Sequence, residues 1–346
     1  ALSTSTALTR SDSHKTTSID LKATSNRTSS TFFTGTEPGD EIANYSFNYT
    51  RATGTVVRST SVNFYEKWTD TGDGIRDLNE LTLVRAQSAT ASVDVLKLSS
   101  SYRGNKTTEA GVTMGTLGNT DTGKDATNRQ SRTYFAGDIQ GSEVADYSYN
   151  YLSNGSTVRS TSYNFYENAT GTIRAQSANP TDALKITVNY RGAMVLAAGD
   201  DPELFTTDRQ SKTFFYTAFG QGDEIADYSY NYAKDGLTVK TVSYNFYTAN
   251  KLRAEDLAPS DTPSLSKTDS YKGSDSTAID TPNKKRSSTY FYGTEPGDEI
   301  ADYTLSYQAK DGSTVRSTSV NFYGDGTKRA KDATANSDAL KLSVNY

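Results

Sequence analysis

One stretch of this chain, written four times, constrains the fold more than any other feature. It reads GDEIANYSFNY from Gly39, GSEVADYSYNY from Gly141, GDEIADYSYNY from Gly222 and GDEIADYTLSY from Gly297. A motif that returns together with its surroundings is typical of tandem-repeat proteins, in which each repeat is one small structural unit. The sequence therefore predicts an array of repeats that pack against their neighbours.

Within each repeat the side chains alternate with a period of two. In DYSYNY, Tyr228, Tyr230 and Tyr232 fall on one face of an extended strand, and Ser229 and Asn231 fall on the other. Tyr, Val, Thr and Phe also favour a pleated, half-buried surface. A further alternating run, STVRSTSVNFY in the last copy, follows the motif in every repeat. These runs predict antiparallel strands.

Turn signals separate the alternating runs. SNGS (residues 153–156) and AKDG (residues 233–236 and 309–312) place Asn-Gly or Asp-Gly between two strands, which is the strongest short-range sign of a hairpin. No stretch sustains apolar residues at helical spacing. We therefore expect an all-β fold, a tandem array of about four antiparallel β units that is β-sandwich or β-solenoid-like, preceded by an N-terminal partial unit.

The repeats set the expected division of the chain. The predicted segments are a partial repeat at residues 1–25, unit 1 at residues 26–127 with an acidic insert at 68–81 and a linker at 105–127, unit 2 at 128–207, unit 3 at 208–282 and unit 4 at 283–346. LTRSDSHKTTSIDLKA in the partial repeat is similar to IRAQSANPTDALKITV at the end of unit 2. We expect residues 3–25 to form a closing strand pair that docks on unit 4 of a neighbouring subunit.

Composition narrows the class of protein. The formal net charge is -5, with both signs spread along the chain, which argues against nucleic acid as a partner and against a polybasic membrane anchor. No apolar run is long enough to span a membrane. There is no Cys for disulfides or thiol chemistry, and 24 Tyr supply the apolar surface that the scarce aliphatic residues do not. Abundant Ser, Thr, Asn and Gly favour an extracellular or cell-surface location.

The repeated motif contains an acid that two interpretations explain. Paired carboxylates serve acid–base catalysis or bind cations, but an active site is normally built once, from converging elements. Here the acid returns in every repeat together with a basic residue, which favours an electrostatic clasp between strands or units. The expected inter-unit clasp contains Glu41, Glu143, Glu224, Glu299, Arg58, Arg159, Lys240 and Arg316.

A single-copy insert, WTDTGDGIRDLNEL at residues 68–81, carries the only break in the pattern. Asp70, Asp73, Asp77 and Glu80 with interspersed glycines approximate an oxygen-rich calcium loop, because Ca²⁺ takes six to eight oxygen ligands and Gly allows the sharp turn. The run resembles the DxDGDGxxDxxE loops of thrombospondin type 3 and other bacterial surface repeats, although Asp70 is out of register with them. Calcium is thus the one cofactor expected, and an acidic hairpin extension is the alternative.

The alternation DYSYNY…DGSTVRSTSYNFY is similar to long, tyrosine-rich tandem-repeat surface proteins of bacteria, and more faintly to the YD repeats of the Rhs family. That resemblance implies an extracellular structural role. With one His and no Cys, and no recognisable nucleophile motif, we expect no enzyme and no catalytic residues. The expected function is a structural protein that polymerises with copies of itself, by strand-edge pairing, into a filament, stalk or surface layer. The alternative is an adhesin that displays Trp68 and the long loops to a glycan, a host surface or a protein.

Overall fold

The fold is known from a computed structural model. It describes residues 6–14, 27–50, 54–68, 81–91, 93–105, 128–196, 200, 204–258, 260–273, 284–294, 296–333 and 338–346. The regular elements in these residues are β-strands and short 3-10 helices, so the all-β prediction is confirmed.

Each repeat contributes four long strands, which we call the opening, second, third and closing strands. The opening strands are β2 (Arg27–Thr34), β7 (Arg129–Ala136), β12 (Arg209–Tyr216) and β16 (Lys285–Tyr292). The second strands are β3 (Ile42–Tyr49), β8 (Val144–Tyr151), β13 (Ile225–Tyr232) and β17 (Ile300–Tyr307). The third strands are β4 (Val57–Trp68), β9 (Val158–Asn168), β14 (Val239–Tyr247) and β18 (Val315–Tyr323).

The closing strands outnumber the complete repeats by one, because the partial repeat supplies its own. They are β1 (Arg10–His14), β6 (Val95–Arg103), β11 (Ala183–Arg191), β15 (Leu265–Lys272) and β19 (Leu340–Asn345). Two short strands lie after the third strands: β5 (Leu81–Arg85) and β10 (Gly171–Arg174). The 3-10 helices before the closing strands are η3 (Ala86–Ser88), η4 (Ala175–Ser177), η5 (Ala254–Asp256) and η8 (Ala330–Asp332).

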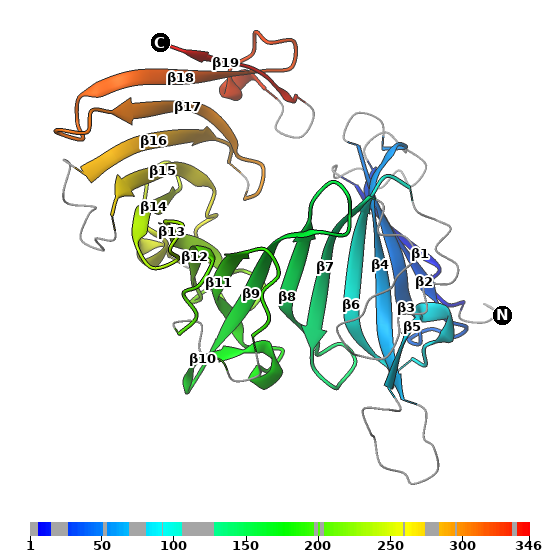
Figure 1. The fold of residues 1–346 in the computed structure, drawn as a ribbon. Coiled ribbons are helices and arrows are strands. Elements are labelled where there is room, and N and C mark those ends of the chain that lie inside the picture. Colours follow the sequence, from blue (N-terminus) through cyan, green and yellow to red (C-terminus); the bar gives the residue numbers. More distant parts are fainter. Residues whose placement is uncertain are drawn as a thin grey trace. The chain divides into compact units, whose positions relative to one another are not determined.

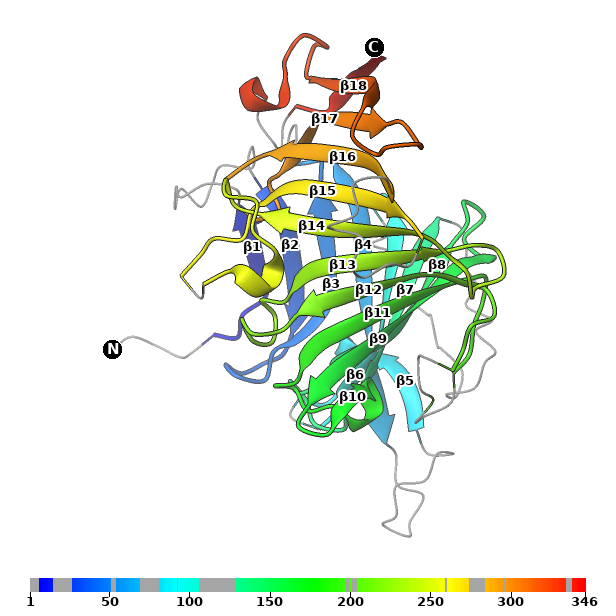
Figure 2. The same ribbon diagram turned by 90° about the vertical axis from the view of Figure 1, so that its left-hand side faces the viewer.

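The strands form one long open antiparallel sheet of 19 strands (Figure 1). Along the meander, opening, second, third and closing strands pair in turn, and each closing strand then pairs with the opening strand of the next repeat. Figure 2 shows β11 to β18 following one another in chain order. Antiparallel neighbours can be joined by tight turns, and the hairpin signals of the sequence lie between the second and third strands.

The predicted hairpins are confirmed by their turns. Asn154 Oδ1 accepts hydrogen bonds from the backbone N–H groups of Ser156 and Thr157 (3.1 and 3.0 Å), as a turn-forming Asn does. Gly155 follows with a φ of 68°, a left-handed conformation that Gly adopts without steric cost. Asp235 and Asp311 make the equivalent bonds in the third and fourth repeats.

A register shift recurs at equivalent places in the ladders. Opening and second strands shift beside the aromatic pair Phe214/Phe215 and at the equivalent residues of the other repeats. Closing and opening strands shift at the penultimate residue of the closing strand in β11 and β15, which is Tyr190 and Tyr271 respectively. A β-bulge bends its strand and increases the local twist, so these shifts mark a bend at an equivalent place in each repeat.

The two faces of the sheet differ in composition. On one face the opening and second strands stack aromatic rings at centroid distances of 4.5–4.6 Å, in the pairs Phe32–Tyr45, Tyr134–Tyr147, Phe214–Tyr228 and Tyr290–Tyr303. On the other face hydroxyl groups meet at 2.8–3.0 Å, in the pairs Thr31–Ser46, Thr133–Ser148, Thr213–Ser229 and Thr289–Thr304. Strand alternation thus separates an aromatic face from a polar face.

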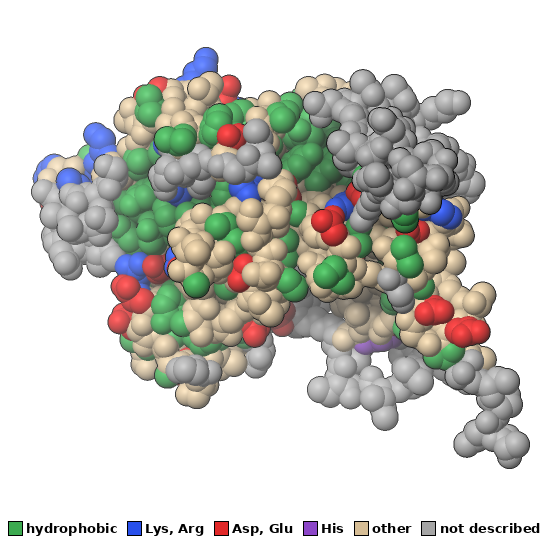
Figure 3. All heavy atoms as spheres, turned by 90° about the horizontal axis from the view of Figure 1, so that it is seen from below, with side chains coloured by type: hydrophobic (Ala, Val, Ile, Leu, Met, Phe, Trp, Pro, Cys, Tyr) green, Lys and Arg blue, Asp and Glu red, His purple; other side chains and the backbone are tan. Residues whose placement is uncertain are grey.

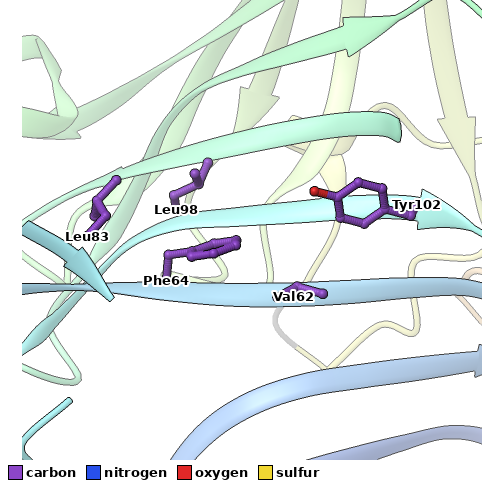
Figure 4. Close-up of a cluster of buried hydrophobic side chains, with 5 residues drawn as sticks. All are labelled: Val62, Phe64, Leu83, Leu98 and Tyr102. Atoms are coloured by element: carbon purple, nitrogen blue, oxygen red, sulfur yellow. The ribbon is translucent and has the colours of Figure 1, made fainter. Parts of the chain in front are cut away.

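Buried clusters lie on both faces. On the aromatic face, Val62 and Phe64 of β4 pack with Leu83 of β5 and with Leu98 and Tyr102 of β6, and all five side chains are buried (Figure 4). At one end of the polar face a smaller cluster lies beneath a 3-10 helix. In the third repeat it contains Tyr247, Ala254 and Leu257.

By its contacts the chain divides into two compact units. The first contains residues 1–163, 174–180 and 192–195, and the second contains residues 164–173, 181–191 and 196–346. Each unit holds more than one repeat, and all contacts discussed below lie within one unit or the other. Figure 3 shows acidic and basic side chains interspersed over the face that it draws, as the sequence composition indicates.

The partial repeat contributes one strand among the residues described, at Arg10–His14. It pairs with β2 as β15 pairs with β16, with Asp12 opposite Ser30 where Asp269 is opposite Ser288. LTRSDSH therefore matches LSKTDSY of β15, in a different alignment from the one expected with the end of unit 2. The segment IDLKA (residues 19–23) lies outside the described residues.

Candidate functional site

The four repeated glutamates lie at the junctions between repeats and bind backbone amides. One carboxylate oxygen accepts a hydrogen bond from the N–H at the start of the preceding closing strand; the four pairs are Glu41 with Leu8 (2.7 Å), Glu143 with Leu96 (2.8 Å), Glu224 with Leu184 (2.7 Å) and Glu299 with Leu265 (2.7 Å). We call this contact the glutamate clasp. It joins consecutive repeats.

The second oxygen of each glutamate orders the loop that carries it. It accepts from the glycine N–H two residues earlier, at 2.7 Å from Gly39 and Gly141, 3.0 Å from Gly222 and 2.8 Å from Gly297. Hydrogen bonds from Leu8 and Gly39 lower the pKa of Glu41 below its ordinary value. Each glutamate thus accepts hydrogen bonds from two backbone amides, an arrangement suited to structural bridging.

The four basic residues expected to complete this clasp lie elsewhere. Arg58, Arg159, Lys240 and Arg316 are each the second residue of a third strand, with exposed side chains. Among the described residues, no ion pair joins any of them to a glutamate. The backbone supplies the donors instead, and a backbone donor leaves no mark in the sequence.

A second repeated contact, which the sequence reasoning missed, lies inside each repeat on the aromatic face. An arginine after the third strand reaches back to an acid or amide of the second strand; the pairs are Arg85–Asn44, Arg174–Asp146, Arg253–Asp227 and Arg329–Asp302. We call it the acid–arginine pair. Both partners recur in every repeat, as the RA stretch and the residue before the first Tyr of the motif, and that joint recurrence was the available signal.

The acid–arginine pair of the second repeat is the most buried of these pairs. The side chains of Asp146 and Arg174 are 5% and 3% exposed, and their shortest distance is 2.8 Å. Arg174 also stacks over the ring of Tyr163, 4.8 Å from its centroid. Burial raises the pKa of Asp146, and the bonds from Arg174 and Gln176 offset only part of that effect.

The junctions between closing and opening strands are of two chemical kinds. In the polar seams, β1–β2 and β15–β16, an Asp of the closing strand faces a Ser. Ser30 Oγ donates to Asp12 and Ser288 Oγ donates to Asp269, both at 2.6 Å. Lys267 and Lys285 also lie 2.8 and 2.9 Å from Asp269.

These donors determine the charge state of the buried acid. Burial alone would raise the pKa of Asp269, but the bonds from Lys267, Ser288 and Lys285 outweigh it and lower the pKa below its ordinary value. Asp12 behaves in the same way, with Ser30 and Arg10 as the main donors. A polar seam therefore contains a charged Asp at neutral pH.

In the basic seams, β6–β7 and β11–β12, the same register brings an uncharged residue opposite a long cation. Ser100 faces Arg132, and Val188 faces Lys212. Both cations are 2% exposed. The ammonium group of Lys212 lies 4.7 Å from the ring centroid of Phe214, so its aliphatic stem covers apolar surface while its charge meets the aromatic face.

The residues expected to bind calcium, Asp70, Asp73, Asp77 and Glu80, lie outside the described residues. Within the described ranges, no group of three or more His, Asp or Glu side chains is placed to hold a metal ion. Trp68, at the edge of the insert, is the last residue of β4 and is half-buried.

Comparisons with protein-family models and with curated proteins find no match. No helix in the described part of the chain has the length and hydrophobicity needed to span a membrane.

Proposed function

We propose that this chain is a non-enzymatic structural repeat protein of the extracellular space or cell surface. Its open sheet is extended by strand-edge pairing with copies of itself, as part of a filament, stalk or surface layer. The resemblance to tyrosine-rich bacterial surface repeats supports the location. The observation that carries the proposal is the way in which consecutive repeats are joined: at every junction described, the closing strand of one repeat pairs antiparallel with the opening strand of the next.

The side chains of β19 resemble those of an interior strand. Leu340, Leu342 and Tyr346 are 56%, 47% and 73% exposed. At the matching position of β15, which has strands on both sides, Tyr271 is 3% exposed. An exposed apolar edge strand is a template for pairing with another chain.

Strand β1, which pairs with β2 and with no further strand in the described part of the chain, carries charges. In β1, Arg10 forms an ion pair with Asp12. Both side chains lie beside β2 on the aromatic face of the sheet. Charged side chains on an edge strand oppose further pairing.

The repeated acids support a structural role. Each glutamate of the clasp is bound by two backbone amides, and the acid of each acid–arginine pair is bound by its arginine where it is an Asp. Groups held in the same way in every repeat fit a scaffold better than a reaction centre, which needs converging residues that differ from their repeats.

Assembly is tested by substituting one residue of β19. The backbone of Tyr346 exchanges hydrogen bonds with Thr318 of β18, so alternation directs the N–H of Ser343 to the open edge. Ser343→Pro removes that donor, and Ser343→Ala is the matched control, since both variants lose the hydroxyl contact with Ser319.

We expect negative-stain microscopy and light scattering to show ordered assemblies of the wild type and Ser343→Ala, and dispersed particles of Ser343→Pro. Undiminished assembly of the proline variant would contradict the proposal. Deletion of residues 1–25 tests the other end, where docking of the N-terminal segment predicts loss of assembly.

A binding surface is the second candidate. The stacked Tyr290–Tyr303 pair belongs to a repeat whose aromatic face is only half-buried, Lys251 lies 5.5 Å from the ring of Tyr290, and Tyr292 nearby in sequence is 51% exposed. Exposed aromatic rings are surfaces on which sugars stack. A glycan array with and without Ca²⁺ tests it, and saturable binding lost in Tyr290→Ala would favour this function over a purely structural one.

Calcium binding by the insert is a separate proposal. Isothermal titration with Ca²⁺ should show one binding event that is absent from an Asp73→Asn, Asp77→Asn variant. An unchanged titration of that variant would exclude these ligands.

A further inference from the structure

We propose that the stacked pairs Tyr134–Tyr147 and Tyr290–Tyr303 are sites of oxidative cross-linking. At each site a dityrosine bond joins an opening strand to the second strand of the same repeat. The oxidant is a haem peroxidase acting with hydrogen peroxide, which removes one electron at a time. The inference goes beyond the proposed function, because it concerns a covalent modification within one chain and does not depend on assembly.

In both pairs the two rings lie face to face across neighbouring strands. The ring centroids are 4.5 Å apart in Tyr134–Tyr147 and 4.6 Å apart in Tyr290–Tyr303, and the angles between the ring planes are 13° and 15°. The π orbitals of nearly parallel rings point at each other, and a carbon–carbon bond between two rings forms by overlap of these orbitals. The stack therefore holds the reacting carbon atoms close to van der Waals contact.

Other tyrosine neighbours that the structure describes on this face are less well placed. Their centroid distances are 5.2–6.5 Å and the angles between their ring planes are 31–77°. Tyr244 and Tyr271, for example, are 5.9 Å apart at 74°. In such an edge-to-face pair the π orbitals of the two rings are nearly perpendicular. Orientation thus favours coupling in the stacked pairs.

The backbone holds each stacked pair in position. Tyr290 lies directly opposite Tyr303 in the antiparallel ladder of β16 and β17. The loop that joins these strands is ordered by Glu299, which accepts a hydrogen bond from the N–H of Gly297 at 2.8 Å. The pair of the second repeat is held by the equivalent ladder and the equivalent loop contact. Reacting groups that are positioned in advance lose little further freedom when they meet.

Each coupling removes two electrons and two protons from the pair. The oxidant takes one electron from each phenol, and the hydroxyl protons pass to water, which leaves two phenoxyl radicals. A bond then forms between one Cε atom of each ring, and the hydrogen atoms of these carbons move to the phenol oxygens as the rings regain aromaticity. Burial raises the pKa of Tyr290 and of Tyr303, so both begin as protonated phenols at neutral pH.

The first and third repeats contain the same stack without a second phenol. Phe32–Tyr45 and Phe214–Tyr228 have centroid distances of 4.6 and 4.5 Å and interplanar angles of 18° and 16°. A phenyl ring has no hydroxyl proton to release and is not oxidised to a phenoxyl radical. These two pairs therefore share the geometry but lack the chemistry, and they serve as internal controls.

A bond in the fourth repeat would close residues 290–303 into a covalent loop. That loop contains Glu299, which binds the N–H of Leu265 in the glutamate clasp. A cross-link stabilises a folded protein mainly by restricting the unfolded chain. The modification would thus reinforce the hairpin that carries the contact between repeats.

The test treats the full chain with a haem peroxidase and hydrogen peroxide, at a protein concentration at which the chain is dispersed. Trypsin then releases residues 133–159 and residues 287–310, each of which contains one stacked pair. A second cleavage, after Glu143 or Glu299, separates the two tyrosines of a pair unless a bond joins them. Mass spectrometry identifies a linked product that retains both halves and lacks two hydrogen atoms.

We expect linked products from both tyrosine pairs of the wild type, and none after treatment with hydrogen peroxide alone. Tyr290→Phe should reduce the product from residues 287–310 to background and leave that of the second repeat unchanged. Phe214→Tyr gives the third repeat the pair found in the second and fourth. This variant should gain a linked product from residues 213–234 after cleavage at Glu224.

Absence of both linked products from the wild type would overturn the proposal. It would also be overturned by an undiminished product in Tyr290→Phe, or by the failure of Phe214→Tyr to gain one. A mixture of isotope-labelled and unlabelled chain distinguishes bonds within one chain from bonds between two chains. Products that join labelled to unlabelled halves would contradict coupling within the stacked pairs.

Discussion

The second and fourth repeats contain the same acid–arginine pair in different surroundings. The shortest distance is 2.8 Å in both, but the side chains of Asp146 and Arg174 are 5% and 3% exposed, whereas those of Asp302 and Arg329 are 20% and 36% exposed. The same pair with the same distance therefore contributes differently to the stability of the two repeats. Loss of one partner leaves a buried charge in the second repeat and a largely hydrated one in the fourth.

The largest expected effect comes from removing the arginine in each setting. Arg174→Ala should destabilise the surrounding strands by about 3–5 kcal/mol, because Asp146 loses its counter-charge in a buried site. Arg329→Ala should cost under about 1 kcal/mol. A chain of this length need not unfold in one transition, so local hydrogen exchange of β8 and β17 is the proper measurement. Equal effects would show that burial does not set the difference.

A second substitution tests what determines the loss of stability: the burial of the substituted residue or the position of its repeat in the array. Asp269 belongs to the seam that leads into the exposed fourth repeat, but it is 2% exposed itself. Asp269→Ala leaves Lys267, Lys285 and Ser288 without their acceptor, and we expect about 2 kcal/mol of local destabilisation after allowance for partial solvation of the lysines. Exchange in β15 and β16 measures it, and a smaller effect than that of Arg329→Ala would contradict the role of burial.

The contribution of the glutamate clasp to stability should be similar in the buried and the exposed repeat. Glu143 and Glu299 bind the same two amides at similar distances in the buried and the exposed repeat. Glu143→Gln and Glu299→Gln should each cost about 1–2 kcal/mol, since the amide keeps one acceptor oxygen but loses its charge. Thermal denaturation and exchange of β6 and β15 compare them, and a large difference would show that the clasps depend on their surroundings.

The smallest expected effect is a difference in acid sensitivity between seams. The pKa of Asp269 is lowered from its ordinary value of 3.8, as is that of Asp12, so their stabilisation is present above that value and is lost as pH falls through the lower folded-state pKa. The basic seam β11–β12 has Val188 at this position and lacks the effect. Exchange corrected for intrinsic rates should therefore accelerate below about pH 4 more in β15–β16 than in β11–β12. Equal acceleration of exchange in the two seams would contradict the predicted difference in acid sensitivity.

The sequence predicted the elements that depend on local pattern. Alternation identified the strands, and Asn154-Gly155 and its equivalents identified the hairpins, because both signals reside in a few consecutive residues. Recurrence in every repeat singled out the glutamate, and in the structure Glu224 lies at a junction, where it binds the N–H of Leu184 in the preceding closing strand.

The sequence did not predict contacts whose partner is a backbone group or a residue far away in the sequence. The clasp binds backbone N–H groups, which every residue except Pro possesses, so the choice of Arg58 and its equivalents rested on their charge and their recurrence. The true ion pair joins Arg174 to Asp146, 28 positions earlier, across a fold that only the strand order brings together. The bulges likewise arise from register, which residue type alone does not specify.

Because the donor of the glutamate clasp is a main-chain amide, it determines which substitutions the junction between repeats tolerates. Only the glutamate can be lost by ordinary substitution, because the amide of Leu184 or Leu265 persists whatever side chain replaces the leucine, Pro excepted. Substitution of the leucine thus preserves the attachment between neighbouring repeats, whereas substitution of the glutamate removes it.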